Sequence, residues 1–339
     1  MGNNLIGLGL KAYWQFGREA TWATAPTINR RLGLEAASIG PSVGIAEDPN
    51  MPAAAGAGSS QAWTDAEIYA VGEKAEGTIG GVLDYEGQLQ LLDMIYGTDT
   101  YGSYGATVSG TNPYTHVFTD REFLNSVTSE LVEGNIPAGK CVQILGQKLR
   151  SLVLSGNAAM GAAGMVRWKA EVVGQKALSN ATPTGALSQV ARIPVLFGHC
   201  TTMTDGSADA ASLVKVTGFE LTLRPAVADG RLYLGTGNFI DEPLRAGKVK
   251  CQLRLKRMFT SRSLFDLYKA NTSAALQIVF ADGNGRSITI DLARAKLVEQ
   301  PKHDINADGF MEEDALWQAT WSTFASKITV INTQASAAA

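Results

Sequence analysis

Apolar and polar residues alternate along much of the chain. In residues 248–256, valine, cysteine and leucine take every second position, and lysine, glutamine and arginine take the positions between them. Residues 218–225 and 286–292 alternate in the same way. A period of two places one face of a strand on a core and the other face in water. The pattern therefore predicts strands at all three places.

Helical spacing of apolar residues is confined to short stretches. It occurs in residues 86–96, before Gly97, and in residues 261–269, where Thr260 or Ser261 can serve as the N-cap. Residues 280–287 place Asp-Gly-Asn-Gly between two strand patterns, which predicts a tight hairpin. Few helices beside many strands predict an all-β core with one helix packed on each sheet.

The same succession of elements occurs twice. Residues 77–174 and residues 251–325 each predict a strand, a short helix and then three further strands. An internal repeat of this kind is typical of chains that build rings, stacks or arrays. The predicted organisation is an N-terminal arm (1–28), a first β unit (29–189), a second β unit (190–330) and a flexible C-terminal tail (331–339).

Long segments rich in small and polar residues separate the predicted elements. They are residues 41–63, 97–113, 176–189 and 201–212. Loops of this length are unusual inside a compact domain, so we expect segments that become ordered when a neighbouring molecule arrives.

Composition narrows the function classes. The 339 residues include 36 glycines and only 18% charged residues, with a formal net charge of −3. That balance argues against a nucleic-acid reader, which would carry a basic stripe. The three widely spaced cysteines form neither a disulfide framework nor a zinc pattern, so a reducing compartment is expected. The sequence predicts no secretory signal and no membrane span.

One segment partly matches a calcium loop. Asp304, Asn306 and Asp308 occupy the first, third and fifth positions of an EF-hand-like pattern. The twelfth position is Ala315, where a bidentate glutamate is needed. The pattern favours a polar hairpin turn over a metal site.

The sequence shows no catalytic motif that would suggest a function other than the one indicated by the repeat. None of the three histidines has a visible nucleophile and orienting group, and neither a G-x-S-x-G elbow nor a dinucleotide-binding glycine pattern occurs. The sequence therefore predicts neither an enzyme nor a cofactor.

Two groups of residues are candidates for contacts between subunits. Trp14 and Trp22 lie on the predicted arm, where large aromatic side chains could anchor it on another subunit. Lys248, Lys250, Arg254 and Lys256, followed by Arg257, make a basic strand face. That face is either solvated or opposite an acidic surface of a neighbour, and the sequence alone leaves both readings open.

Several of these segments together resemble one known family. FGREATWATAP, GFELTLRP, GKVKCQLRLKRMFTSRSLFDLYKA and the pair GQKLRSLVLSG and MVRWKAEVVG are similar to the tail tube proteins of long-tailed bacteriophages. The resemblance implies a β-sandwich or barrel-like unit with a short α-helix. It also implies rings that stack into a hollow tube through which the viral genome passes. Two units in one chain would allow a trimer with pseudo-sixfold symmetry, and a hexamer is the alternative.

The resemblance also implies partners and a location. The partners are further copies of the chain, the tape measure, distal tail and tail terminator proteins, and double-stranded DNA in transit without sequence-specific binding. The protein would be made in the host bacterial cytoplasm and reside in the virion tail, with no membrane partner. The alternatives are a distal tail or baseplate ring protein and an unrecognised all-β enzyme.

Overall fold

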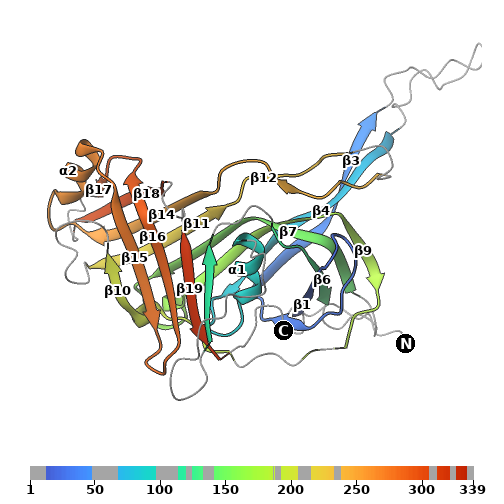
Figure 1. The fold of residues 1–339 in the computed structure, drawn as a ribbon, viewed down its shortest axis with the longest axis horizontal. Helices are drawn as coiled ribbons and strands as arrows, with labels where there is room; N and C mark the ends of the chain where they lie inside the picture. The colour runs from blue at the N-terminus through green and yellow to red at the C-terminus, as the bar shows by residue number, and fades with distance from the viewer. Residues whose placement is uncertain are drawn as a thin grey trace, which may run out of the picture.

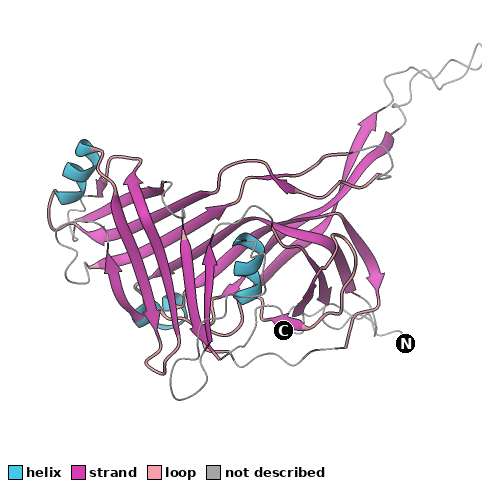
Figure 2. Cartoon of the chain, in the orientation of Figure 1, coloured by secondary structure: helices cyan, strands magenta, loops and turns pink. Residues whose placement is uncertain are grey.

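The computed structural model describes residues 13–47, 68–96, 114–119, 124–132, 141–185, 187, 192–204, 215–232, 238–304, 311–320 and 326–333. Strands dominate it, with helices α1 and α2 among the described residues (Figure 2). The mainly β fold confirms the prediction that strands dominate the chain.

The elements of the first part of the chain are β1 (Tyr13–Arg18), β2 (Arg30–Leu32), β3 (Ala36–Glu47), β4 (Ile68–Val82), α1 (Leu89–Tyr96), β5 (Tyr114–Thr119), β6 (Val127–Val132), β7 (Cys141–Asn157), β8 (Arg167–Gly174) and β9 (Lys176–Ala181). Those of the second part are β10 (Cys200–Thr204), β11 (Val216–Arg224), β12 (Val227–Ala228), β13 (Leu244–Arg245), β14 (Lys250–Met258), α2 (Ser263–Ala270), β15 (Ala274–Ala281), β16 (Ser287–Leu297), β17 (Lys302–Asp304), β18 (Glu312–Ala319) and β19 (Lys327–Asn332). Short 3-10 turns occur at Gly161–Gly164 and Phe197–His199.

One long antiparallel sheet runs through both parts of the chain. Its neighbouring strands follow the order β3-β4-β8-β7-β11-β14-β18. A second group has the order β10-β15-β16-β19-β5 and joins the long sheet where β16 pairs with β18. A third group, β2-β1-β6-β7-β9, uses the first half of β7. The pairing therefore links all three groups into one system.

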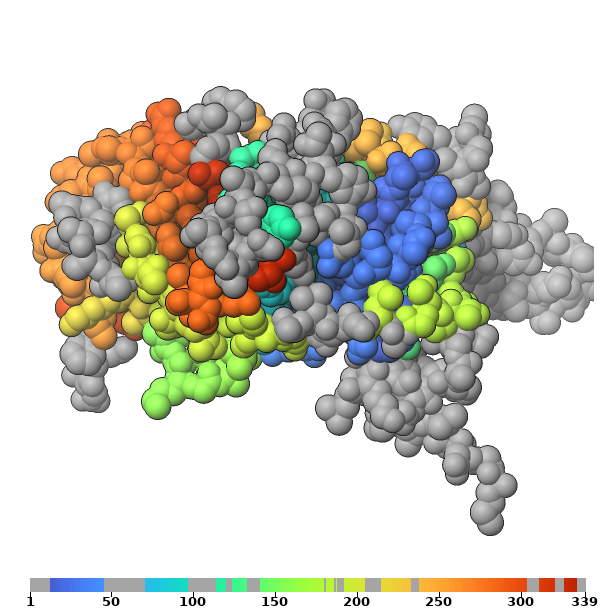
Figure 3. Space-filling view, turned by 60° about the horizontal axis from the view of Figure 1, so that its bottom comes forward, coloured from blue at the N-terminus to red at the C-terminus, as the bar shows by residue number. Residues whose placement is uncertain are grey.

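The molecule is elongated. Figure 1 shows β10, β15, β16 and β19 at one end, β1, β6 and β9 toward the other, and the β3–β4 hairpin projecting beyond them. The space-filling view shows the same separation, with the second part of the chain covering one end and the N-terminal strands near the other (Figure 3).

The period-two predictions are confirmed at β14. Cys251, Leu253 and Leu255 are buried, while Lys250 and Lys256 are exposed. Strands β11 and β16 follow the same rule over most of their length. Local alternation therefore identified which side of these strands faces the core.

The Asp-Gly-Asn-Gly hairpin is also confirmed. Asp282 accepts hydrogen bonds from the backbone N–H groups of Asn284 and Arg286, at 2.7 and 3.1 Å. Gly283 and Gly285 have φ values of 79° and 88°, which glycine adopts at little cost. The turn joins β15 to β16.

Both predicted helices exist, but their environments differ. Every residue of α1 is buried, whereas Leu264 is the buried residue of α2. Arg262 occupies the N-cap position of α2, and the hydroxyl of Ser261 accepts a hydrogen bond from the N–H of Ser263. Asn271, at φ 50°, ends α2 in the left-handed conformation.

The prediction of an N-terminal arm is wrong for residues 13–18. These residues form β1, which pairs with β2 on one side and with β6 on the other. Trp14 and Phe16 are buried in the core, so β1 is part of the folded body. At the other end of the chain, β19 extends into the predicted tail as far as Asn332, which is also buried.

Parts of the predicted long loops are strands. Residues 41–47 belong to β3, residues 176–181 form β9, and residues 201–204 lie in β10. Strand pairing over long sequence separations orders these small and polar residues despite their low local propensity.

Candidate functional site

The two tryptophans predicted to contact another subunit both pack within their own chain. Trp14 is completely buried, with its ring 4.6 Å from that of Phe16. Trp22 is half-buried, and its indole N–H donates to the carbonyl oxygen of Gly146 at 3.1 Å. The prediction that Trp14 anchors the chain on another subunit is therefore wrong, because its side chain is completely buried. Trp22 remains a predicted contact.

Gly146 shows why Trp22 lies where it does. Gly146 has a φ of 66°, and a Cβ added there would lie 2.7 Å from Nε1 of Trp22. Its N–H donates to the buried carboxylate of Glu19 at 2.8 Å. A glycine is thus required for both the backbone conformation and the close approach of the indole ring.

Replacing Gly146 by alanine should lower the free energy of unfolding by about 1–3 kcal/mol, because a left-handed conformation is strained for alanine. Urea unfolding followed by tryptophan fluorescence measures the loss. Gly198→Ala is the matched control, since an added Cβ there meets nothing within 4 Å and φ is not positive. Equal stability of the two variants would contradict the role of Gly146.

The basic face on and beside β14 is only partly free. Lys248, Lys250 and Lys256 are exposed, but Arg254 Nε lies 3.0 Å from the carboxylate of Asp314. Lys256 lies opposite Gly218 on β11 and Asp314 on β18. Of the predicted basic side chains, the three lysines therefore remain the candidates for contacts with a neighbour.

Arg257 does not belong to that face. Its guanidinium is buried and contacts the buried carboxylate of Glu313 at 2.8 Å. Nε2 of His303 lies 3.1 Å from the other oxygen of Glu313. Alternation places Arg257 on the core side of β14, so this ion pair supports the fold and is unavailable to a partner.

Two carboxylates that could face such a basic surface on a neighbouring chain, Glu76 and Asp84, are already engaged within their own chain. Glu76 lies 2.9 Å from Lys74 and 3.0 Å from Arg150. The hydrogen bond from Lys74 holds the pKa of Glu76 below its usual value, although burial opposes it. Asp84 is buried and lies 3.1 Å from Arg192. Neither carboxylate is free for a neighbour.

The candidate calcium residues stay untested. Asn306 and Asp308 lie outside the described residues, and Asp304 ends β17, which pairs with β18. Within the described residues, no cluster of three or more histidine, cysteine, aspartate or glutamate side chains could hold a metal ion.

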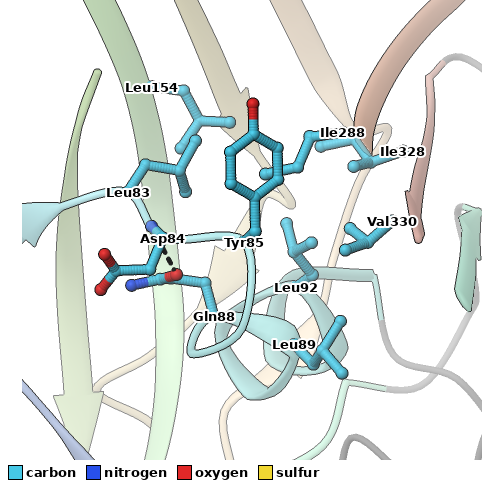
Figure 4. Close-up of a pocket in the computed structure, with 10 residues that line it drawn as sticks. All are labelled: Leu83, Asp84, Tyr85, Gln88, Leu89, Leu92, Leu154, Ile288, Ile328 and Val330. Carbon is cyan, nitrogen blue, oxygen red and sulfur yellow. Dashed lines mark hydrogen bonds between the residues drawn. The ribbon is translucent and has the colours of Figure 1, made fainter. Parts of the chain in front are cut away.

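One small pocket lies between the two parts of the chain. Figure 4 shows Tyr85 and Leu92, from the segment around α1, facing Ile288, Ile328 and Val330 from β16 and β19. Its lining is mostly aliphatic. The carboxylate of Asp84 points away from this apolar group (Figure 4).

Asp84 is the one carboxylate among the residues that line this pocket. Burial raises its pKa, and the guanidinium of Arg192 partly offsets that rise. Its backbone N–H donates to Gln88 Oε1 at 2.8 Å, which fixes the turn before α1 (Figure 4). The arrangement packs the two parts of the chain together, and the hydroxyl of Tyr85 lies 3.2 Å from Nδ1 of His199.

Polar contacts between the two parts were not foreseen from the sequence. Arg286 Nε donates to the buried Glu86 at 2.7 Å, and Asn332 Nδ2 donates to the carbonyl of Tyr85 at 2.9 Å. The hydroxyls of Tyr96 and Ser326 lie 2.9 Å apart. The two groups of each contact are at least 200 residues apart in sequence, and no local signal marks them.

The projecting hairpin exposes apolar side chains. Val43, Ile45 and Val71 on β3 and β4 are 46%, 67% and 50% exposed. Figure 1 shows this hairpin extending away from the body. Apolar side chains gathered on an exposed element are typical of surfaces that bind other proteins. The sequence showed the alternation here only weakly, because glycine and alanine interrupt it.

The described residues therefore present strand edges, an apolar hairpin and a basic face, all of which suit assembly. No helix in the described part of the chain is long and apolar enough to cross a membrane. None of the curated proteins matches the chain. The family model described as phage tail tube protein matches residues 9–319. The chain therefore belongs to the phage tail tube protein family and is a structural protein of the virion tail.

Proposed function

We propose that the chain carries two tail-tube units and that three chains close into one ring with pseudo-sixfold symmetry. The rings stack into the hollow tube through which the phage genome passes into the host. Family membership implies self-assembly and association with other tail proteins. The two units in each chain, the three chains in each ring and the passage of DNA go beyond what family membership implies.

The observation that carries the proposal is a repeated strand order. In the first half, neighbouring strands follow the order β1-β6-β7-β8-β4-β3. In the second half, they follow the order β10-β15-β16-β18-β14-β11. Strands β9 and β19 pair with the first parts of β7 and β16 in the same way. Helices α1 and α2 follow β4 and β14, so the elements named here have counterparts in both halves.

The register repeats as well as the order. Leu154 on β7 lies opposite Trp168 on β8, and Leu297 on β16 lies opposite Trp317 on β18. Two residues further along the same ladders, on the same face, the pairs are Leu152 with Ala170 and Ala295 with Ala319. All these side chains are buried. Corresponding core positions therefore hold similar apolar pairs, which supports two units: the predicted 29–189, extended to include β1 (Tyr13–Arg18), and the predicted 190–330.

The two halves are joined by strand pairing. Strand β7 of the first half pairs with β11 of the second, and β5 of the first half pairs with β19. Strand β5 lies between α1 and β6 and has no counterpart in the second half. Two units bound in this way supply two neighbouring positions of a ring, which supports three chains for six positions.

Electron microscopy and native mass spectrometry of the purified protein test the proposal. Hollow tubes built from rings of three chains are expected. Rings of six chains would overturn the trimer, and single rings that never extend would favour a distal tail or baseplate protein. Discrete monomers at all concentrations would overturn the assembly itself.

The other partners follow from the same proposal. The tube ends would contact the tape measure, distal tail and tail terminator proteins, and the exposed Lys248, Lys250 and Lys256 are candidates for contacts between subunits. The net charge of −3 supports transit of DNA without tight binding, because strong phosphate contacts would retain the DNA.

A further inference from the structure

We infer that the outer edge of β3 in one chain pairs with the outer edge at the end of β16 in a neighbouring chain. This contact copies the strand junction that already joins the two halves of each chain. The inference rests on the proposed ring of three chains. It names the surface through which those chains meet.

The junction within the chain provides the template. Leu152–Asn157 of β7 pair antiparallel with Gly218–Leu223 of β11, in six residue pairs. This pairing makes one continuous sheet across the boundary between the halves. The β7 side comes from the first half and the β11 side from the second.

The repeated topology shows which edges correspond. Strand β3 pairs with β4 in the first half as β11 pairs with β14 in the second, so β3 corresponds to β11. Likewise, β16 pairs with β18 as β7 pairs with β8, so β16 corresponds to β7. In a closed ring of equivalent units, every unit uses the same two surfaces. The junction between chains should therefore join β16 of the second half to β3 of the next first half.

Both of these edges lack a neighbouring strand in the described part of the chain. Strand β3 pairs with β4 alone, and Ala36, Ala37 and Ser38 are exposed. Strand β16 pairs with β15 only as far as Ala295, and Val298 is 44% exposed. An unpaired strand edge is a template for pairing with another chain.

Prolines limit how far each edge can pair. Pro41 lies in β3 and Pro301 follows β16. Proline has no N–H to donate, and on an edge strand it is tolerated where its nitrogen faces away from the neighbouring strand. The two prolines thus confine pairing to the short stretches before them, which discourages indiscriminate aggregation.

The same alternation identifies the outward donors. Pro41 lies opposite Ala75 on β4, so its nitrogen faces outward, and Ala37, four residues earlier, shares that direction. On the other edge, the N–H of Val298 donates to Leu316 on β18 at 3.0 Å. Continued just beyond the end of β16 at Leu297, the alternation assigns the next N–H, of Glu299, to the outward side. These two N–H groups can be removed without breaking a bond inside the chain.

The test compares Ala37→Pro with Ala37→Val, which keeps the N–H and the strand propensity. Ala37→Pro should weaken ring formation about tenfold or more, because a backbone acceptor of the neighbour loses its donor and the proline ring intrudes. Ala37→Val should assemble like the unaltered chain. Sedimentation velocity and electron microscopy measure assembly, and circular dichroism confirms that each monomer is folded.

Glu299→Pro is the second variant and tests the opposite edge, with Glu299→Gln as its control. A photoreactive p-benzoylphenylalanine in place of Ala36 identifies the partner strand independently of either proline variant. Cross-links to residues 294–303 of a second chain support the inference, and cross-links to another strand overturn it. Normal rings from both proline variants would also overturn it while leaving the proposed ring intact. Failure of the unaltered chain to form rings would instead count against the proposed function.

Discussion

Replacing Glu313 by glutamine should lower the free energy of unfolding by about 3–5 kcal/mol. Glu313 and Arg257 lie opposite each other on β18 and β14, and both side chains are buried. Arg257 Nε donates to Glu313 Oε2 at 2.9 Å. Glutamine keeps the size of the side chain but removes its charge, so the buried guanidinium loses the carboxylate that it contacts.

The double variant Arg257→Met with Glu313→Leu separates the charge from the packing. Replacing both partners by apolar residues of similar volume removes the uncompensated charge, so it should cost much less than Glu313→Gln alone. Urea unfolding of the dilute monomer, followed by circular dichroism, measures all three proteins. A loss below about 1 kcal/mol for Glu313→Gln would contradict the role of this ion pair in stability.

The faces of the strands were predictable from the sequence because side-chain direction alternates with a period of two. Residues 250–258 illustrate this, since each leucine that alternation assigned to the core is buried. The same reasoning applied to the basic side chains would have placed Arg257 on the inner side with Leu255. Its charge made it look like part of the surface, and its partner Glu313 lies 56 residues away.

Strand neighbours were not predictable, because periodicity identifies a face and says nothing about an edge. The first half of β7 pairs with β6 and β9, and the second half pairs with β8 and β11. Long-range complementarity selects these neighbours. For the same reason, the sequence predicted a repeat but not the pairing of β7 with β11 that joins the two parts of the chain.

Helix α1 illustrates a further limit. Its apolar spacing predicted one buried face, but Gln90 and Asp93 are buried too. Asp93 lies 3.4 Å from Arg18 of β1 and accepts a hydrogen bond from Asn125 at 2.9 Å. Segments distant in sequence thus cover the polar side of α1 and satisfy its carboxylate, which a helical pattern cannot reveal.

Replacing Trp14 by alanine should lower the free energy of unfolding by about 3–5 kcal/mol, the range for removing a large buried aromatic side chain. Trp14 lies opposite Leu131 on β6 and Leu32 on β2, and its exposed fraction is 0%. The alternation of Trp14 and Phe16 with Gln15 and Gly17 was a strand signal, so the arm prediction overlooked local evidence. Loss of this ring leaves a cavity at the centre of the β2-β1-β6 group.

Two further variants separate a core role from a role in assembly. Trp14→Phe should cost less than Trp14→Ala, because phenylalanine fills most of the space and removes a buried indole N–H that has no acceptor among the described residues. Trp22→Ala should cost about 1 kcal/mol for its lost hydrogen bond to Gly146. Urea unfolding of the monomers ranks the three, and electron microscopy follows their assembly. A Trp14→Ala chain that keeps full stability but forms no rings would show that Trp14 acts in the interface between subunits and not in the core. The burial of its ring between β2 and β6 predicts the reverse order of effects, with the monomer weakened first and assembly lost only as a consequence.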